Sequence, residues 1–133
     1  GGEAEEKEEG PRTVLVADDN EGRRDMILKV LEDAGHQGLA AKDGDEAIAI
    51  HKEHASEIGL SIIDWVMPGR DGKSVLQEIL DYDPQSRVIM TSGFSRDYVR
   101  SEIRLGAWGF LQKPFSDEEL VAAIGEAKAR ETT

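Results

Sequence analysis

Residues 60–72, LSIIDWVMPGRDG, are the stretch that decides the fold. Leu60 to Ile63 form a short apolar run, which predicts a buried strand, and Asp64 ends that strand abruptly. The proline and the glycines that follow predict a loop. A carboxylate at the end of a buried strand is typical of the ligand-binding edge of an open, mostly parallel sheet.

Short apolar runs alternate with helical repeats on both sides of this stretch. Gly35 is the expected C-cap of the first helix, and Ser116 with Glu119 forms an expected capping box at the last one. Five strands that alternate with five helices predict an α/β fold with a mostly parallel sheet, covered on both faces through right-handed crossovers. The predicted strands are residues 13–17, 37–41, 60–63, 87–91 and 108–111, and the predicted helices lie near residues 26–34, 44–54, 75–80, 95–105 and 116–127.

The chain has 133 residues, a formal net charge of −12 and no cysteine. Its length fits one domain with an ordinary core. The lack of cysteine excludes disulfides and thiolate metal sites. The negative charge disfavours binding to nucleic acid and to an anionic membrane surface. We therefore expect a soluble, cytoplasmic protein, either free or tethered to a membrane-bound sensor in a longer parent.

The first residues differ in composition from the rest of the chain. Residues 1–10 contain five Glu, one Lys and no large apolar side chain, so they cannot offset the entropy cost of ordering. We expect a disordered acidic tail or linker at residues 1–11, one domain at residues 12–130 and a short C-terminal tail at residues 131–133.

Charged and hydroxyl side chains follow four of the five predicted strands. Asp18 and Asp19 follow the first strand, Asp64 the third, Ser92 the fourth and Lys113 the fifth. These groups should converge, because the carboxyl ends of parallel strands meet at one edge of the sheet. Adjacent carboxylates repel one another, and oxygen ligands with open positions suit Mg²⁺ (or Mn²⁺). A carboxylate beside such a cation can attack phosphorus, while a lysine and a hydroxyl stabilise the transferred group.

Four motifs, in this order, resemble the receiver domain of two-component response regulators. They are VLVADDN at residues 14–20, IIDWVMPGRDG at residues 62–72, TSG at residues 91–93 and GFLQKPF at residues 109–115. The resemblance extends over about residues 12–130. It implies a flavodoxin-like, doubly wound sheet with strand order 2-1-3-4-5, and a signalling switch rather than an enzyme.

The resemblance also implies a role for each acidic residue at the strand ends. Asp64 would be the phosphoacceptor. Asp19, Asp64 and the backbone carbonyl of Val66 would ligate the metal directly, and Asp18 would act mainly through a bound water. Lys113 would pair with the phosphoryl group.

Four further residues have implied roles around the phosphoryl group. Ser92 would donate its hydroxyl to a phosphoryl oxygen, and its neighbour Thr91 is expected to alternate to the other face of the strand. Phe110 occupies the position of an aromatic switch residue that is more often Tyr in this family. Pro114 would help to aim the preceding lysine through a cis peptide bond.

Other classes of protein fit these residues less well. A phosphatase of the haloacid dehalogenase type needs a second carboxylate two positions after its nucleophile, and Val66 stands there. A phosphorylation-independent interaction domain with a degenerate receiver fold should lack a site residue, and none is missing. His36, His51 and His54 are expected to be solvated side chains rather than metal ligands or phosphodonors. Trp65 adjoins the third strand end and should report on the site.

The expected partners also come from the resemblance. A histidine kinase or a histidine phosphotransfer domain would be the phosphodonor, and a downstream protein would bind the switched face. Homodimerisation on phosphorylation is left open. The acidic segment before Pro11 and the motifs near residues 91–95 and 109–115 resemble receivers at the C-terminus of hybrid sensor histidine kinases. A stand-alone regulator and the receiver of a DNA-binding regulator are the alternatives.

Overall fold

The computed structural model describes residues 13–103 and 106–131, in which strands and helices alternate. The expected acidic tail at residues 1–11 and the last residues, 132–133, lie outside the described residues. The strands are β1 (Thr13–Ala17), β2 (Gln37–Ala41), β3 (Ile58–Asp64), β4 (Val88–Ser92) and β5 (Gly109–Gln112). The helices are α1 (Glu21–Asp33), α2 (Gly44–Glu53), α3 (Gly72–Tyr82), α4 (Arg96–Ile103) and α5 (Asp117–Glu131).

The strands form one parallel sheet in the order β2-β1-β3-β4-β5, which confirms the predicted fold class. Every residue of β1 is buried, whereas the edge strand β2 is mostly exposed. The edge position of β2 explains why its sequence is poor in large side chains. The strand order reverses between β1 and β3, so a ligand site is expected at their carboxyl ends.

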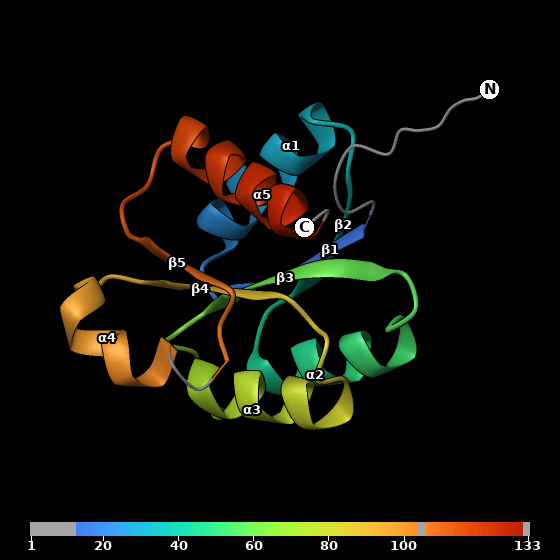
Figure 1. Cartoon of the computed structure of the whole chain (residues 1–133), viewed down its shortest axis with the longest axis vertical. Helices are drawn as coiled ribbons and strands as arrows, with labels where there is room; N and C mark the ends of the chain where they lie inside the picture. The colour runs from blue at the N-terminus through green and yellow to red at the C-terminus, as the bar shows by residue number, and fades with distance from the viewer. Residues whose placement is uncertain (1–12, 104–105, 132–133) are drawn as a thin grey trace.

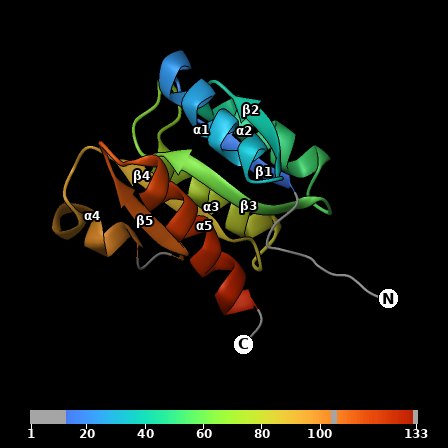
Figure 2. The same ribbon diagram turned by 90° about the horizontal axis from the view of Figure 1, so that it is seen from above.

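Helices cover both faces of the sheet, with α1 and α5 on one face and α2, α3 and α4 on the other (Figure 1). The view from above in Figure 2 shows α1 and α5 over the strands. Val14 and Val16 pack toward α1 and α5, and Leu15 and Ala17 pack toward the opposite helices. Because both faces are covered, β1 is apolar at every one of these positions. Among the described residues, no helix is both long and apolar enough to cross a lipid bilayer.

Hydrogen bonds define two of the predicted helix ends, and the C-cap of α1 is Ala34, one residue before the predicted Gly35. Gly35 has a positive φ of 92° just after α1. The N–H groups of Gly35 and His36 return to carbonyls in the last turn, which is a Schellman motif. At α5, the Ser116 N–H donates to Glu119 Oε1 at 2.8 Å, and the Glu119 N–H donates to Ser116 Oγ at 3.1 Å. This reciprocal pair is the expected capping box.

Strand bounds differ from the prediction by one or two residues, and α1 begins at Glu21 rather than near residue 26. β3 begins earlier than the predicted run and includes Asp64, and β4 and β5 are each shifted by one residue toward the C-terminus. The helix expected at residues 95–105 is described as α4, and residues 104–105 lie outside the described residues. Pairing between neighbours sets these bounds, because Asp64 pairs with Thr91 and Ser92 pairs with Gln112.

The expectation that His51 is a solvated side chain is wrong. His51 is 2% exposed, because α2 packs against α3 and places this position inside the interface. Its Nε2 lies 3.2 Å from Ser86 Oγ, and its ring meets the Tyr82 ring edge-on. Burial lowers the pKa of His51, so the neutral ring is favoured. His54 differs, because it is half-buried and its Nδ1 lies 3.3 Å from Glu57 Oε1.

Gly72 allows α3 to begin directly against the end of β3. Its N–H donates to the Trp65 carbonyl at 2.9 Å, and the Asp71 side chain caps the helix. A Cβ atom added at Gly72 would contact the Asp64 carbonyl oxygen and lie 2.7 Å from Trp65 Cα. Both are backbone atoms of the segment that carries Asp64, so any larger residue at position 72 has to displace that segment.

Gly72→Ala is therefore expected to lower the free energy of unfolding by about 1–3 kcal/mol, the usual cost of overpacking. Gly125→Ala in α5 is the matched control, because nothing lies within 4 Å of an added Cβ there. This control should be neutral or stabilising by up to about 1 kcal/mol. Denaturant unfolding of both variants measures the difference, and equal stabilities would contradict the close approach at Gly72.

Candidate functional site

Three carboxylates meet at the carboxyl edge of the sheet, where the strand order reverses. Asp18 and Asp19 follow β1 directly, and Asp64 is the last residue of β3. One carboxylate oxygen from each residue lies within 4.8 Å of the other two. Asp18 and Asp64 are 1% and 2% exposed, whereas Asp19 faces solvent. The predicted convergence of these three residues is confirmed.

The segment that enters α1 supplies the partners of Asp18. Asp18 Oδ1 accepts a hydrogen bond from the Asn20 N–H at 2.8 Å, and Oδ2 accepts one from Arg23 Nε at 2.7 Å. Burial alone would lower the pKa of Arg23, but the hydrogen bond to Asp18 and the charges of Asp18, Asp64 and Asp19 outweigh it and raise that pKa. The Asp18 carboxylate is therefore already paired with a cation.

Lys113, which follows β5, reaches the carboxylate of Asp64. Its Nζ donates to Asp64 Oδ1 at 2.8 Å, and the Val66 N–H donates to the same oxygen at 3.3 Å. Burial raises the pKa of Asp64, the charge of Asp18 adds to that rise, and the hydrogen bond and charge of Lys113 oppose it without cancelling it. The ionised form of Asp64 is thus held at a free-energy cost, which a further cation would reduce.

The backbone fixes the position of Lys113. Its N–H donates to the Ser92 carbonyl at 2.7 Å, so the chain leaves β5 beside the end of β4. The Lys113–Pro114 peptide bond is cis, as predicted. Lys113 and Arg23 line the same hollow of about 510 Å³ beside the carboxylates, so two cations flank one opening. The full lining is Asn20, Gly22, Arg23, Met26, Lys113, Pro114 and Phe115.

Two buried hydroxyls stand at the end of β4. Thr91 pairs with Asp64 in the sheet, and paired residues on neighbouring strands share a face, so strand alternation alone does not exclude Thr91. Ser92 is the next residue, and its Oγ accepts a hydrogen bond from the Phe94 N–H at 2.9 Å. The choice of Ser92 over Thr91 as the hydroxyl donor stays a prediction.

The side chain of Phe110, the expected switch aromatic, is turned into the core. It is 8% exposed and belongs to the same cluster as Met90 and Val99. Phe94 and Tyr98, by contrast, are 45% and 68% exposed, with ring centroids 4.7 Å apart. An exposed aromatic pair therefore marks the connection from β4 into α4, while Phe110 lies beneath the surface.

Arg23 and Arg24 also belong to this site, although neither was predicted from the sequence. Arg24 Nη1 donates to the backbone carbonyl of Asp18 at 2.8 Å, beside the side-chain contact of Arg23. A signal for both residues was present in the sequence. Cations near a helix N-terminus oppose the helix dipole, yet two arginines follow closely after two aspartates at the start of α1. Such an arrangement indicates an anionic site nearby.

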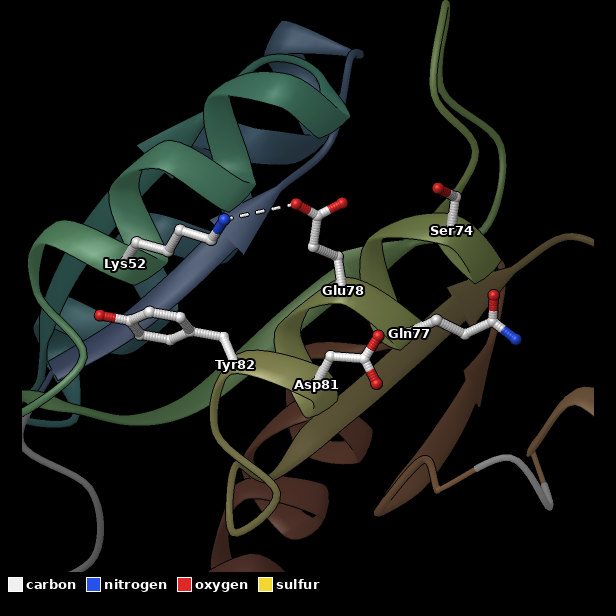
Figure 3. A pocket seen from close by; sticks show the side chains of 6 residues that line it. All are labelled: Lys52, Ser74, Gln77, Glu78, Asp81 and Tyr82. Carbon is white, nitrogen blue, oxygen red and sulfur yellow. Dashed lines mark hydrogen bonds and ion pairs between the residues drawn. The ribbon is translucent and has the colours of Figure 1, made fainter.

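A second hollow, of about 450 Å³, lies between α2 and α3 and contains none of the three clustered aspartates (Figure 3). Lys52 Nζ lies 3.4 Å from Glu78 Oε2, and the two side chains point toward each other in Figure 3. Arg70 Nη1 donates to the other Glu78 oxygen at 2.7 Å. These charges are paired within the protein, so we place the candidate site at the carboxyl edge. The hollow is lined by Lys52, Ser74, Gln77, Glu78, Asp81 and Tyr82.

The carboxylate cluster fits a hard divalent cation. Its donors are all oxygens, and Asp19 makes no hydrogen bond or ion pair with the residues that the structure describes. The exposed side of the cluster leaves room for water ligands, which Mg²⁺ usually keeps. A doubly wound parallel sheet with such a cluster at its switch point defines a flavodoxin-like α/β protein with an acidic cation site.

The chain belongs to the response regulator receiver domain family, whose model matches residues 14–125. Receiver domains are signalling modules, and Asp18, Asp19 and Asp64 form the acidic triad that is typical of their Mg²⁺ site. The chemotaxis protein CheY of Halobacterium salinarum is 32% identical over 116 residues, which cover 86% of this chain and 95% of that protein. The sensor kinase CckA of Brucella abortus is 32% identical over 118 residues, which cover 88% of this chain and 12% of the kinase.

Solved structures agree with this assignment. A response regulator receiver domain protein from Clostridium thermocellum matches with a TM-score of 0.84 and 30% identity, covering 90% of this chain and 96% of that one. A chain of the CheX–CheY–BeF₃–Mg²⁺ complex from Borrelia burgdorferi matches with a TM-score of 0.83 and 28% identity, covering 87% and 88%.

The raised pKa of Asp64 predicts that this carboxylate destabilises the metal-free protein at neutral pH. Above about pH 4 the unfolded chain loses the proton of Asp64 more readily than the native state does, so this group favours unfolding as the pH rises. Asp64→Asn should therefore be more stable than the wild type at pH 7 in EDTA. The difference should shrink as the pH is lowered toward about 4.

Thermal and denaturant unfolding measure this difference. Asp97→Asn is the control, because Asp97 is 85% exposed and its replacement should change the free energy of unfolding by less than about 0.5 kcal/mol. An Asp64→Asn variant that is no more stable than the wild type at pH 7 would contradict the electrostatic account of the site.

Proposed function

We propose that this receiver domain accepts a phosphoryl group on Asp64 in a two-component phosphorelay, with Mg²⁺ (or Mn²⁺) bound beside it. The observation that carries the proposal is the 2.8 Å contact between Lys113 Nζ and Asp64 Oδ1 inside a cluster of three carboxylates. A nucleophile, a counter-cation and a metal site in one place are the parts that aspartyl phosphorylation needs. The Mg²⁺ in the Borrelia burgdorferi CheX–CheY complex supports the choice of metal.

Each residue of the cluster would have its own role in the phosphoryl transfer. Bound Mg²⁺ would supply positive charge to the oxygens of the phosphoryl group. Asp19, Asp64 and the Val66 carbonyl would hold it directly, and Asp18 would hold it through water. An Asp64 oxygen would form a bond to phosphorus while the bond from phosphorus to the histidine nitrogen of the donor breaks, and that nitrogen would leave with the electron pair. Lys113 would then balance the charge of the phosphoryl group.

The switch would begin at the end of β4. Ser92 Oγ now accepts a hydrogen bond from the Phe94 N–H, so turning this hydroxyl toward a phosphoryl oxygen would release that contact and rearrange the start of α4. The rearrangement would then extend into β5 and α5. Phe110, which is packed under the same region, and Pro114, which is next to Lys113, would shift with it. A downstream protein, or a second copy of the chain, would bind this face, which presents the exposed rings of Phe94 and Tyr98.

The phosphodonor would be a histidine kinase or a histidine phosphotransfer domain. We further propose that the chain is the receiver of a hybrid sensor histidine kinase. The acidic composition of residues 1–10 and the similarity to a segment of the CckA sensor kinase support this context. The similarity to CheY of Halobacterium salinarum over 95% of that protein supports the stand-alone regulator as the second candidate. The sequence of the full-length gene product would distinguish a hybrid kinase from a stand-alone regulator.

The proposed function predicts one phosphoryl increment in the intact mass after incubation with Mg²⁺ and acetyl phosphate. The increment should disappear in Asp64→Asn and in EDTA, because the acceptor or the metal is then missing. Asp97→Asn should retain it as a matched surface control. An increment of equal size in Asp64→Asn would contradict the assignment of the acceptor. No increment in the wild type with either acetyl phosphate or phosphoramidate would contradict phosphoacceptor function.

Phosphorylation rates can distinguish the role of the Ser92 hydroxyl from that of the Thr91 hydroxyl. Ser92→Ala should slow phosphorylation by acetyl phosphate at least about tenfold, because a hydrogen-bond donor to the developing charge is lost. Thr91→Val keeps the shape of its side chain and should change the rate by less than about threefold. The opposite order of effects would assign the donor role to Thr91.

A further inference from the structure

Arg23 occupies a position where helix electrostatics disfavour a cation. It lies in the first turn of α1, where the helix dipole repels positive charge. Its backbone N–H donates to the Asn20 side chain at 2.8 Å, which fixes the residue at this place. Its side chain turns back over the helix end to Asp18. The phosphoryl transfer proposed above gives Arg23 no task, so its placement needs a separate explanation.

The contact puts a positive charge inside the acidic cluster. Arg23 Nε lies 2.7 Å from Asp18 Oδ2, and Nη2 lies 3.4 Å from Oδ1. The Asp18 side chain is 1% exposed and that of Arg23 is 31% exposed, so solvent screens this pair only partly. Arg24 bonds the backbone carbonyl instead. Among the described residues, Arg23 is thus the cation paired with the Asp18 side chain.

The charge of the cluster depends on what is bound. Lys113 pairs with Asp64 and Arg23 pairs with Asp18. These two cations and the three ionised carboxylates together carry one unit of negative charge without metal, not counting Arg24 at the Asp18 backbone carbonyl. A divalent cation would turn that into one unit of positive charge. Arg23 therefore reduces repulsion before the metal arrives and becomes a repulsive neighbour once it is bound.

We propose that Arg23 is a built-in counter-cation that competes with Mg²⁺ for the cluster of Asp18, Asp19 and Asp64 and so sets the Mg²⁺ concentration that the protein requires. The inference rests on the proposed function, since it presumes that the cluster binds Mg²⁺. Loss of Arg23 destabilises the metal-free state more than the metal-bound state, and the binding of Mg²⁺ therefore becomes tighter. A residue that merely oriented Asp18 would have the opposite effect, because its loss would disorganise the site and weaken binding.

The test is the dissociation constant of Mg²⁺ at low ionic strength, measured by titration calorimetry and by tryptophan emission, to which Trp65 next to Asp64 contributes. Arg23→Gln should lower this constant about five- to tenfold, the scale expected for removing one charge near a divalent ion in a largely aqueous environment. Arg23→Lys keeps the charge and should stay within about twofold of the wild type. Lys29→Gln removes the same charge from α1, but the Lys29 side chain is 74% exposed and, among the described residues, its ammonium pairs with Asp33 rather than with the cluster, so this variant should also stay within about twofold.

If the Arg23→Gln variant is unfolded without metal, a second measurement replaces the titration, namely the melting temperature as a function of Mg²⁺ concentration. Binding to the native state raises the melting temperature with Mg²⁺ concentration, so that dependence gives the affinity directly. A larger rise for Arg23→Gln than for the wild type supports the proposal. Unchanged or weaker Mg²⁺ binding by Arg23→Gln overturns it while leaving the proposed function intact. A wild type that binds no Mg²⁺ overturns the proposed function itself.

Discussion

Mutual repulsion among three carboxylates is the constraint on which the rest of this structure depends. Asp18 and Asp64 are almost completely buried, and Asp19 stands beside them at the mouth of the site. Burying like charges together is unfavourable unless cations relieve them. Lys113 pairs with Asp64 and Arg23 pairs with Asp18, which gives part of that relief. The pKa of Asp64 is still raised, because burial, with the charge of Asp18 added to it, outweighs the contact with Lys113. A further cation beside these carboxylates would reduce the remaining repulsion.

The fold serves to hold these groups in place. A parallel sheet brings the ends of β1, β3, β4 and β5 to one edge, and the close approach at Gly72 fixes the segment that carries Asp64. The bond from the Lys113 N–H to the Ser92 carbonyl holds the lysine beside the end of β4, where Thr91 pairs with Asp64. Asp64 is therefore connected through Lys113 to β5 and through the end of β4 to α4. A change of charge on Asp64 can reach both elements, as a switch requires.

The sequence predicted the sheet and the carboxylate cluster because both follow from strong local signals. Buried parallel strands are apolar at every position, and polar residues at their carboxyl ends must converge. The burial of His51 could not be predicted in the same way, since it depends on how α2 packs against α3. The register that sets Thr91 beside Asp64 depends on strand pairing, which single-strand alternation does not reveal. The sequence shows two arginines at the start of a helix, but it does not show that Arg23 contacts Asp18. That contact depends on the turn at Asn20, whose side chain accepts a hydrogen bond from the Arg23 N–H.

The central claim, that Asp64 is the residue on which the phosphoryl group forms its bond, is tested most directly by trapping the product. Borohydride reduces an aspartyl phosphate to homoserine, and peptide mass spectrometry then locates the altered residue. Homoserine is expected at position 64 only when both Mg²⁺ and the phosphodonor are present. Homoserine at position 18 or 19, or reduction at several acidic residues alike, would contradict it.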